Sequence, residues 1–280
     1  MRYRGLGFGR LLASVRLPVL ILGLGAWGCA SSQNGPPERK LRPLRAATLD
    51  EVLAAYDGYC KGLTTLSAAG DLDVADIGAG KTRTVSVRFV ADRLGKIYLK
   101  GSVAVVTALE LVSDGEKFWL SLPSKRTVWT GPSKSAGKEG DRDAPYYALR
   151  PDDLTDAFFP AALSTEERGV VLFEGDDQGF SLTEAKARDG RGTVERRVFL
   201  SRETLEPRLI RTYDPKGDVR VEVSFEGWVQ GSPRTVEVLR PLEGYRATFR
   251  LTKFEKNVPL PDKAFLPRLP EGYAVKEVPN

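Results

Sequence analysis

Histidine is absent from all 280 residues, and the chain has only two cysteines and one methionine. Without histidine, neither a Ser-His-Asp triad nor a Cys-His pair can form, and the commonest side-chain ligand of transition metals is missing. These absences exclude the most widespread forms of hydrolytic catalysis. We therefore expect a binding protein that is not an enzyme and that uses no metal or other cofactor.

The excess of positive charge is small and unevenly distributed. The formal net charge is +5, but the first 28 residues hold four arginines and no acid: Arg2, Arg4, Arg10 and Arg16. Removing these residues as a leader would leave +5 − 4 = +1 on the mature chain. A basic charge that comes largely from a leader does not support nucleic-acid binding, so we expect no nucleic-acid partner.

Residues 1–28 have the three parts of a secretory signal peptide. The arginines precede an apolar run from Leu17 to Trp27, and Gly28 is a small residue before the expected cleavage site. The run is too short to favour a permanent membrane span. Cys29 then resembles the lipobox cysteine of bacterial lipoproteins, although Ala26 and Trp27 are unusual there. We expect lipid attachment at Cys29; the alternative is an ordinary signal peptide with an incidental cysteine.

Residues 29–47 are expected to form a lipidated, flexible tether. The segment after Cys29 is polar, contains proline and glycine, and has little to bury. Its 18 residues give a root-mean-square reach of roughly 23 Å. Several acyl chains on one cysteine anchor a protein firmly, and Ala30 after the cysteine indicates sorting to the outer membrane. The sequence therefore predicts a protein anchored to the periplasmic face of the outer membrane.

A helix is expected from Thr48 to about Lys61. Residues 48–51 match a capping box, and apolar side chains follow at helical spacing: Leu49, Val52, Leu53, Tyr56, Cys60 and Leu63. This spacing predicts that Cys60 is a buried structural residue rather than a reactive thiol. Because Cys29 is expected to carry lipid, no intramolecular disulfide is expected.

The rest of the chain alternates between apolar and polar residues, as short strands do. About a dozen strands are indicated, including 85–89, 96–100, 108–112, 117–122, 126–130, 170–174, 180–185, 193–200, 206–213, 221–225 and 247–251. Residues 152–159 look helical, and Pro160 ends that helix. Because the strands present one apolar face that must be covered, we predict a mainly β fold. It is a single curved antiparallel sheet wrapped around the helices, in one domain over residues 48–280.

Several short patterns match known sites only loosely. Residues 75–82 fit a phosphate-binding loop, but a strand rather than a helix follows, which favours a hairpin turn. Ser135 and Lys138 have the spacing of penicillin-interacting enzymes but lie in a glycine-rich loop. Two acidic runs lack the spacing of calcium loops and are expected to be solvated turns: Asp71, Asp73 and Asp76, and Glu174, Asp176 and Asp177. A basic patch is either a solvated face or a contact with anionic lipid headgroups: Arg188, Arg191, Arg196 and Arg197.

Three segments together resemble the LolA/LolB lipoprotein-carrier superfamily. They are the helix at 48–61 with the strand at 68–74, the strand pair at 111–120 followed by Pro123, and the ending at 254–265 and 269–273. The resemblance implies a half-open antiparallel β-barrel of about eleven strands, with helices as a plug or lid. It also implies a cavity for the acyl chains of lipoproteins or other amphiphiles, and lipoproteins or a soluble carrier as partners of an anchored, monomeric member.

Five residues are candidates for this cavity or its lid. Trp119 is expected to lie in the sheet and to face Phe158 and Phe159, whose helix is either a detachable lid or part of a permanent core. Val105 and Val106 belong to an apolar segment that is either a central strand or an exposed element touching lipid. The expected function is amphiphile binding in lipoprotein localisation or envelope biogenesis. The alternative is an envelope scaffold or sensor with a filled interior and a protein partner.

Overall fold

The computed structural model describes residues 45–134, 149–163, 169–188 and 191–278. The chain divides into two compact units, 1–42 and 43–280, and all described residues belong to the second. The expected signal peptide and Cys29 lie outside the described residues, as do Ser135 and Lys138. Among the described residues, no helix is both long and apolar enough to cross a bilayer.

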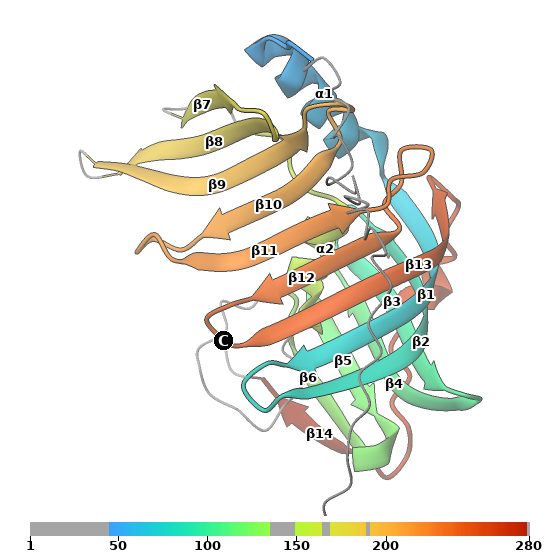
Figure 1. Cartoon of the computed structure of the whole chain (residues 1–280). Helices are drawn as coiled ribbons and strands as arrows, with labels where there is room; N and C mark the ends of the chain where they lie inside the picture. Colours follow the sequence, from blue (N-terminus) through green and yellow to red (C-terminus); the bar gives the residue numbers. More distant parts are fainter. Residues whose placement is uncertain (1–44, 135–148, 164–168, 189–190, 279–280) are drawn as a thin grey trace, which may run out of the picture. The chain divides into compact units, whose positions relative to one another are not determined.

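One large sheet dominates the described part of the chain (Figure 1). Its fourteen strands are β1 Thr65–Asp76, β2 Lys81–Asp92, β3 Lys96–Val103, β4 Val106–Asp114, β5 Lys117–Leu122, β6 Thr127–Pro132, β7 Gly169–Gly175, β8 Gly179–Arg188, β9 Arg191–Ser201, β10 Pro207–Tyr213, β11 Val219–Glu226, β12 Thr235–Arg240, β13 Tyr245–Lys256 and β14 Ala274–Glu277. Their order in the sheet is β14-β6-β5-β4-β3-β2-β1-β13-β12-β11-β10-β9-β8-β7. The predicted mainly β, half-open architecture is confirmed.

The number of strands is larger than the dozen or so that alternation indicated and than the eleven or so that the resemblance implied. Sequence alternation did not reveal β12 or β14. All four side chains of β14 are exposed, so this strand has no apolar face that a pattern could show. It is also the one strand of the sheet that pairs in parallel, with β6, whereas the other neighbours are antiparallel.

Strand β1 joins the early and late halves of the sheet. It pairs with β2 on one side and with β13 on the other, from Leu66 opposite Lys256 to Asp76 opposite Tyr245. The register with β13 shifts at Gly70. A Cβ on this residue would lie 2.0 Å from the backbone oxygen of Arg250, so the close approach of the two strands requires glycine there.

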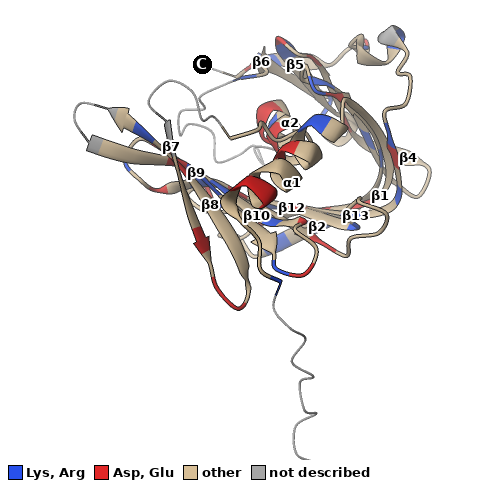
Figure 2. Cartoon of the chain, turned by 90° about the horizontal axis from the view of Figure 1, so that it is seen from above, with Lys and Arg blue, Asp and Glu red and all other residues tan. Residues whose placement is uncertain are grey.

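The sheet curves around two helices, α1 Leu49–Gly62 and α2 Pro151–Phe158, as the view from above shows (Figure 2). Helix α1 begins at Thr48 with the predicted capping box. Its buried face carries Val52, Tyr56 and Cys60, and burial raises the pKa of the Cys60 thiol to about 11. The expected burial of Cys60 is therefore confirmed, and its high pKa opposes thiolate chemistry.

The C-terminal segment covers part of the outer face of the sheet. The 3-10 helix η3 (Asp262–Phe265) contacts β3 and β4, and Phe265 is buried there. Leu111 of β4 and Trp129 of β6 point inward and belong to the main core. Their neighbours Val112 and Val128 therefore lie on the outer face, and both are nevertheless buried. The β4–β6 region is therefore covered on both faces.

Candidate functional site

Helix α2 fills part of the interior through aromatic contacts. The ring centroid of Phe158 lies 4.9 Å from that of Phe89 on β2 and 5.4 Å from that of Phe249 on β13. Phe159 is equally buried, and both rings belong to the main hydrophobic core. The helix is therefore packed against two central strands rather than resting on the rim of the sheet.

A buried ion pair also holds α2. The carboxylate of Asp153 pairs with the guanidinium of Arg240 on β12, and the exposed fractions of their side chains are 1% and 4%. Arg240 also binds Glu243, so its charge is compensated on two sides. Because removing one partner of a buried pair leaves an uncompensated charge, this contact fixes α2 in place.

The segment that follows α2 is held to the sheet by hydrogen bonds from an arginine of β9. Arg196 on β9 donates hydrogen bonds of 2.7 and 2.8 Å to the backbone oxygens of Ala161 and Ala162, and it pairs with Glu184. Of the two proposals for α2, a detachable lid or a permanent core, these contacts favour the permanent core. They also correct the expected basic patch, because strand alternation turns Arg196 inward and Arg197 outward.

Trp119 does not face this helix. It lies on β5, as expected, but its neighbours Phe118 and Leu120 are the residues that join the main core. Successive side chains of a strand point to opposite faces, so Trp119 lies on the outer face, beside Val112 of β4. The prediction that it faces Phe158 and Phe159 is therefore wrong.

A cavity of about 920 Å³ lies where the β1–β2 hairpin, the β3–β4 hairpin and the 3-10 helix η1 (Pro123–Lys125) meet. Its apolar lining comes from the inner face of the sheet and from the hairpins: Val74, Ala79, Val85, Val103, Val106, Ala108 and Leu109. Val85 is four residues from Phe89 on the same face of β2, roughly 13 Å along the strand. The cavity therefore begins beyond the part of the sheet that α2 covers. Its volume is in the range of small-molecule sites.

The β3–β4 hairpin forms one lip of this cavity. Val103 pairs with Val106, and the exposed fractions of Val103, Val105 and Val106 are 57%, 97% and 67%. Of the two alternatives for this segment, a central strand or an exposed apolar element, the structure shows the exposed element. The turn residue Ala104 has φ of 53°, a left-handed conformation that costs a non-glycine residue about 1 kcal/mol. The strained backbone at Ala104 and the exposed valines therefore lie together at the tip of the β3–β4 hairpin.

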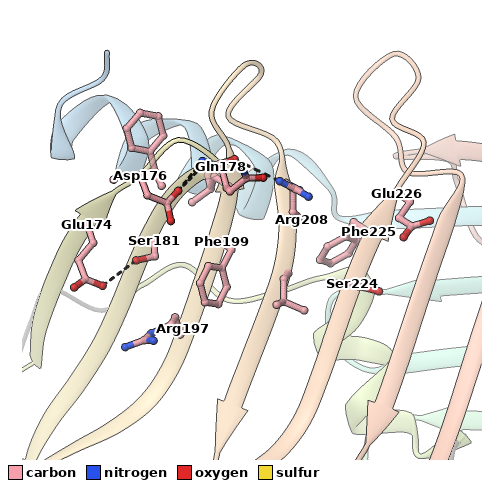
Figure 3. Close-up of a pocket in the computed structure, with 15 residues that line it drawn as sticks. Glu174, Asp176, Gln178, Ser181, Arg197, Phe199, Arg208, Ser224, Phe225 and Glu226 are labelled. Carbon is pink, nitrogen blue, oxygen red and sulfur yellow. Dashed lines mark hydrogen bonds between the residues drawn. The ribbon is translucent and has the colours of Figure 1, made fainter. Parts of the chain in front are cut away.

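A second hollow, of about 710 Å³, lies on the outer face of β7–β11 (Figure 3). Phe199 lines this hollow. The guanidinium carbons of Arg197 and Arg211 lie 6.0 and 5.7 Å from the centroid of its ring. Ser181 donates a hydrogen bond of 3.3 Å to Glu174 at one side. The charged groups around this hollow are of mixed sign, and Asp176 already accepts hydrogen bonds from the backbone of Gln178 and Gly179. The hollow also offers less apolar surface than the first cavity.

The remaining sequence patterns correspond to local structure. Residues 77–80 form the turn between β1 and β2, so the loose phosphate-binding pattern is a hairpin, as predicted. Asp71 and Asp73 accept hydrogen bonds from Ser86 and Thr84 across the β1–β2 pair. In the described ranges, no group of three or more histidine, cysteine or acidic side chains is arranged to hold a metal ion.

Comparisons with known proteins agree in fold only. No protein-family model matches the sequence, and no curated protein matches it. A DUF1329 family protein from Desulfovibrio piger shares the fold, with a TM-score of 0.50 and 16% identity over 76% of this chain and 94% of that one. A LolA superfamily protein from Nitrosomonas europaea matches with a TM-score of 0.48 and 12% identity, over 79% of this chain and 99% of that one. The half-open antiparallel sheet around two helices is the fold that this chain shares with the DUF1329 family protein.

Proposed function

We propose that this protein is a lipid-anchored, non-enzymatic binding protein of the bacterial envelope that holds the acyl chain of an amphiphile. The supporting observation is the 920 Å³ cavity, whose apolar lining comes from the inner face of the sheet and from the hairpins beside it. Apolar walls suit an acyl chain because transfer of each CH₂ from water contributes about 0.8 kcal/mol. The exposed valines of the β3–β4 hairpin give a chain an apolar path into the cavity.

Lipid attachment at Cys29 belongs to this proposal, and so does a place on the periplasmic face of the outer membrane. The anchor would keep the cavity close to a bilayer, where its ligands are found. Absence of catalysis is proposed for the same reason as before, since the chain has no histidine for a Ser-His-Asp or Cys-His arrangement.

A scaffold or sensor on the same fold is the second candidate. The interior around α2 is filled by Phe158, Phe159 and the Asp153–Arg240 pair, as that alternative requires. The two candidates differ in the cavity beyond α2. A scaffold does not require a ligand in this cavity, whereas a carrier must bind one there.

Filling the cavity tests the proposal. Val106 lines the cavity and is 67% exposed, so Val106→Trp adds volume at the entrance without overpacking the core. We expect the unlipidated Cys29→Ser protein to bind a fluorescent fatty acid saturably, and Val106→Trp to weaken this binding by about tenfold, or 1.4 kcal/mol. Fluorescence titration measures both.

The matched control is Leu94→Trp, which places the same side chain on the β2–β3 turn at a residue that is 78% exposed. This variant is expected to bind like the parent. No saturable binding by the parent, or equal binding by both tryptophan variants, would contradict a carrier that uses this cavity.

A further inference from the structure

The cavity has a cationic entrance. Three of its lining residues carry positive charge, Lys81, Arg83 and Lys125, and one carries negative charge, Asp76. The three basic side chains are exposed. Asp76 accepts a hydrogen bond of 2.9 Å from the backbone of Ala79 and so supports the β1–β2 turn. The lining therefore has a formal excess of two positive charges.

The basic residues of β2 continue its apolar wall. Lys81 and Arg83 alternate in register with the buried Val85, so all three lie on the inner face of the sheet. Arg83 is directly opposite the buried Val74 of β1. A step of two residues along a strand is about 6.6 Å, so the wall changes from apolar to basic within that distance.

Lys125 approaches the same space from η1. Its ammonium nitrogen lies 5.9 Å from the ring centroid of Trp129, and Trp129 is a core residue on the inner face of β6. This contact draws Lys125 toward the inner side of the sheet rather than the outer side. The cations therefore stand on two sides of the entrance, on β2 and on η1.

We propose that the cavity selects amphiphiles with an anionic phosphate headgroup, holding the acyl chain on the valine walls and the phosphate between Lys81, Arg83 and Lys125. This inference rests on the proposed function and specifies its ligand. Lysine and arginine bind phosphate by charge-assisted hydrogen bonds. A neutral or zwitterionic headgroup has no net negative charge to complement the formal excess of two positive charges in the lining. The occupant is thus a single anionic phospholipid, extracted from the bilayer.

Two lipids with the same labelled acyl chains test the selectivity. The unlipidated Cys29→Ser protein is titrated with monomeric fluorescent phosphatidylglycerol and with phosphatidylcholine. We expect phosphatidylglycerol to bind about tenfold more tightly, the size of one charge-assisted hydrogen bond, and the difference to shrink as salt is added. Inorganic phosphate at constant ionic strength is expected to displace the lipid only weakly.

The variant Lys81→Gln with Arg83→Gln and Lys125→Gln should bring phosphatidylglycerol to the affinity of phosphatidylcholine and leave phosphatidylcholine unchanged. The matched control removes three exposed cations from the outer face: Arg88→Gln with Lys100→Gln and Arg246→Gln. It should keep the tenfold preference. Thermal unfolding confirms that both triple variants fold.

The outcomes separate the two proposals. Saturable but equal binding of both lipids overturns the headgroup inference and leaves the carrier function in place. Absence of saturable binding of either lipid overturns both. If the entrance variant loses binding to phosphatidylglycerol vesicles yet keeps its preference among monomeric lipids, these cations contact a bilayer surface, and the inference is wrong. Efficient displacement by inorganic phosphate overturns it as well, because the site would then bind the free ion.

Discussion

Asp152, in the first turn of α2, shows what burial does to a single carboxyl group. Its Oδ1 atom is buried and has no hydrogen-bond partner among the described residues. Loss of solvent, with the nearby Asp153 carboxylate adding to the effect, raises the pKa of Asp152 from 3.8 to about 7. The ionised form of this side chain is therefore unfavourable inside the folded protein.

This shift predicts that stability falls as pH rises from about 4 to about 7. In that window the folded state keeps the Asp152 proton and the unfolded state has lost it, so the slope of the unfolding free energy with pH is negative. The upper limit of the loss is about 4 kcal/mol for three pKa units. Asp152→Asn should remove it, so urea unfolding at pH 5 and pH 8 should show a smaller difference for the variant.

The control for Asp152 is Asp50→Asn in the first turn of α1, where the side chain is exposed. This variant should follow the parent at both pH values. Unfolding free energies of the parent and Asp152→Asn that run parallel between pH 5 and pH 8 would show that Asp152 does not titrate in this window.

At the scale of elements, α2 is expected to be a permanent plug. Phe158→Ala removes a ring that contacts Phe89 and Phe249, and loss of a buried phenylalanine side chain costs about 3–5 kcal/mol. Leu172→Ala, at an exposed position of the edge strand β7, should cost less than about 0.5 kcal/mol. Denaturant unfolding measures both. A small loss for Phe158→Ala together with altered fatty-acid binding would instead identify α2 as a lid.

The sequence predicted where helices and strands lie better than it predicted which of their side chains point into the core. Helix α1 was predictable because Thr48 and Glu51 cap it through local hydrogen bonds. Strand β5 was predictable as a strand, but the run Phe118, Trp119 and Leu120 is apolar throughout, so alternation could not say which side chains point inward. The C-terminal segment that buries the outer face near Val112 comes from more than a hundred residues later, and no local pattern contains it.

The candidate cavity was also only partly predictable. Val105 and Val106 were identified as apolar, but a central strand and an exposed hairpin give the same local pattern. The turn at Ala104 has none of the residues that usually mark a hairpin, so nothing in the sequence signalled it. The cationic entrance was missed because Lys81, Arg83 and Lys125 come from two elements that only the curvature of the sheet brings together.

For the whole molecule, attachment and binding are expected to be separable. We expect Cys29→Ser to abolish incorporation of radiolabelled palmitate and to release the protein from the membrane fraction, because Cys29 is the proposed site of the lipid anchor. Cys60→Ser, in the buried face of α1, should remain labelled. Equal labelling of the parent and Cys29→Ser would exclude Cys29 as the lipidated residue.

The pairing of β1 with β13 affects how the newly synthesised chain folds. The backbone N–H of Thr64, just before β1, donates a hydrogen bond of 2.8 Å to Asn257, which is 193 residues further along the chain, and such distant contacts slow folding. Strands β1 to β6 can pair with one another as soon as they have been synthesised, but β1 then presents an unpaired edge until β13, almost the last strand, has been synthesised. A bare edge invites pairing with other chains. The newly synthesised chain is therefore most prone to aggregation in this interval.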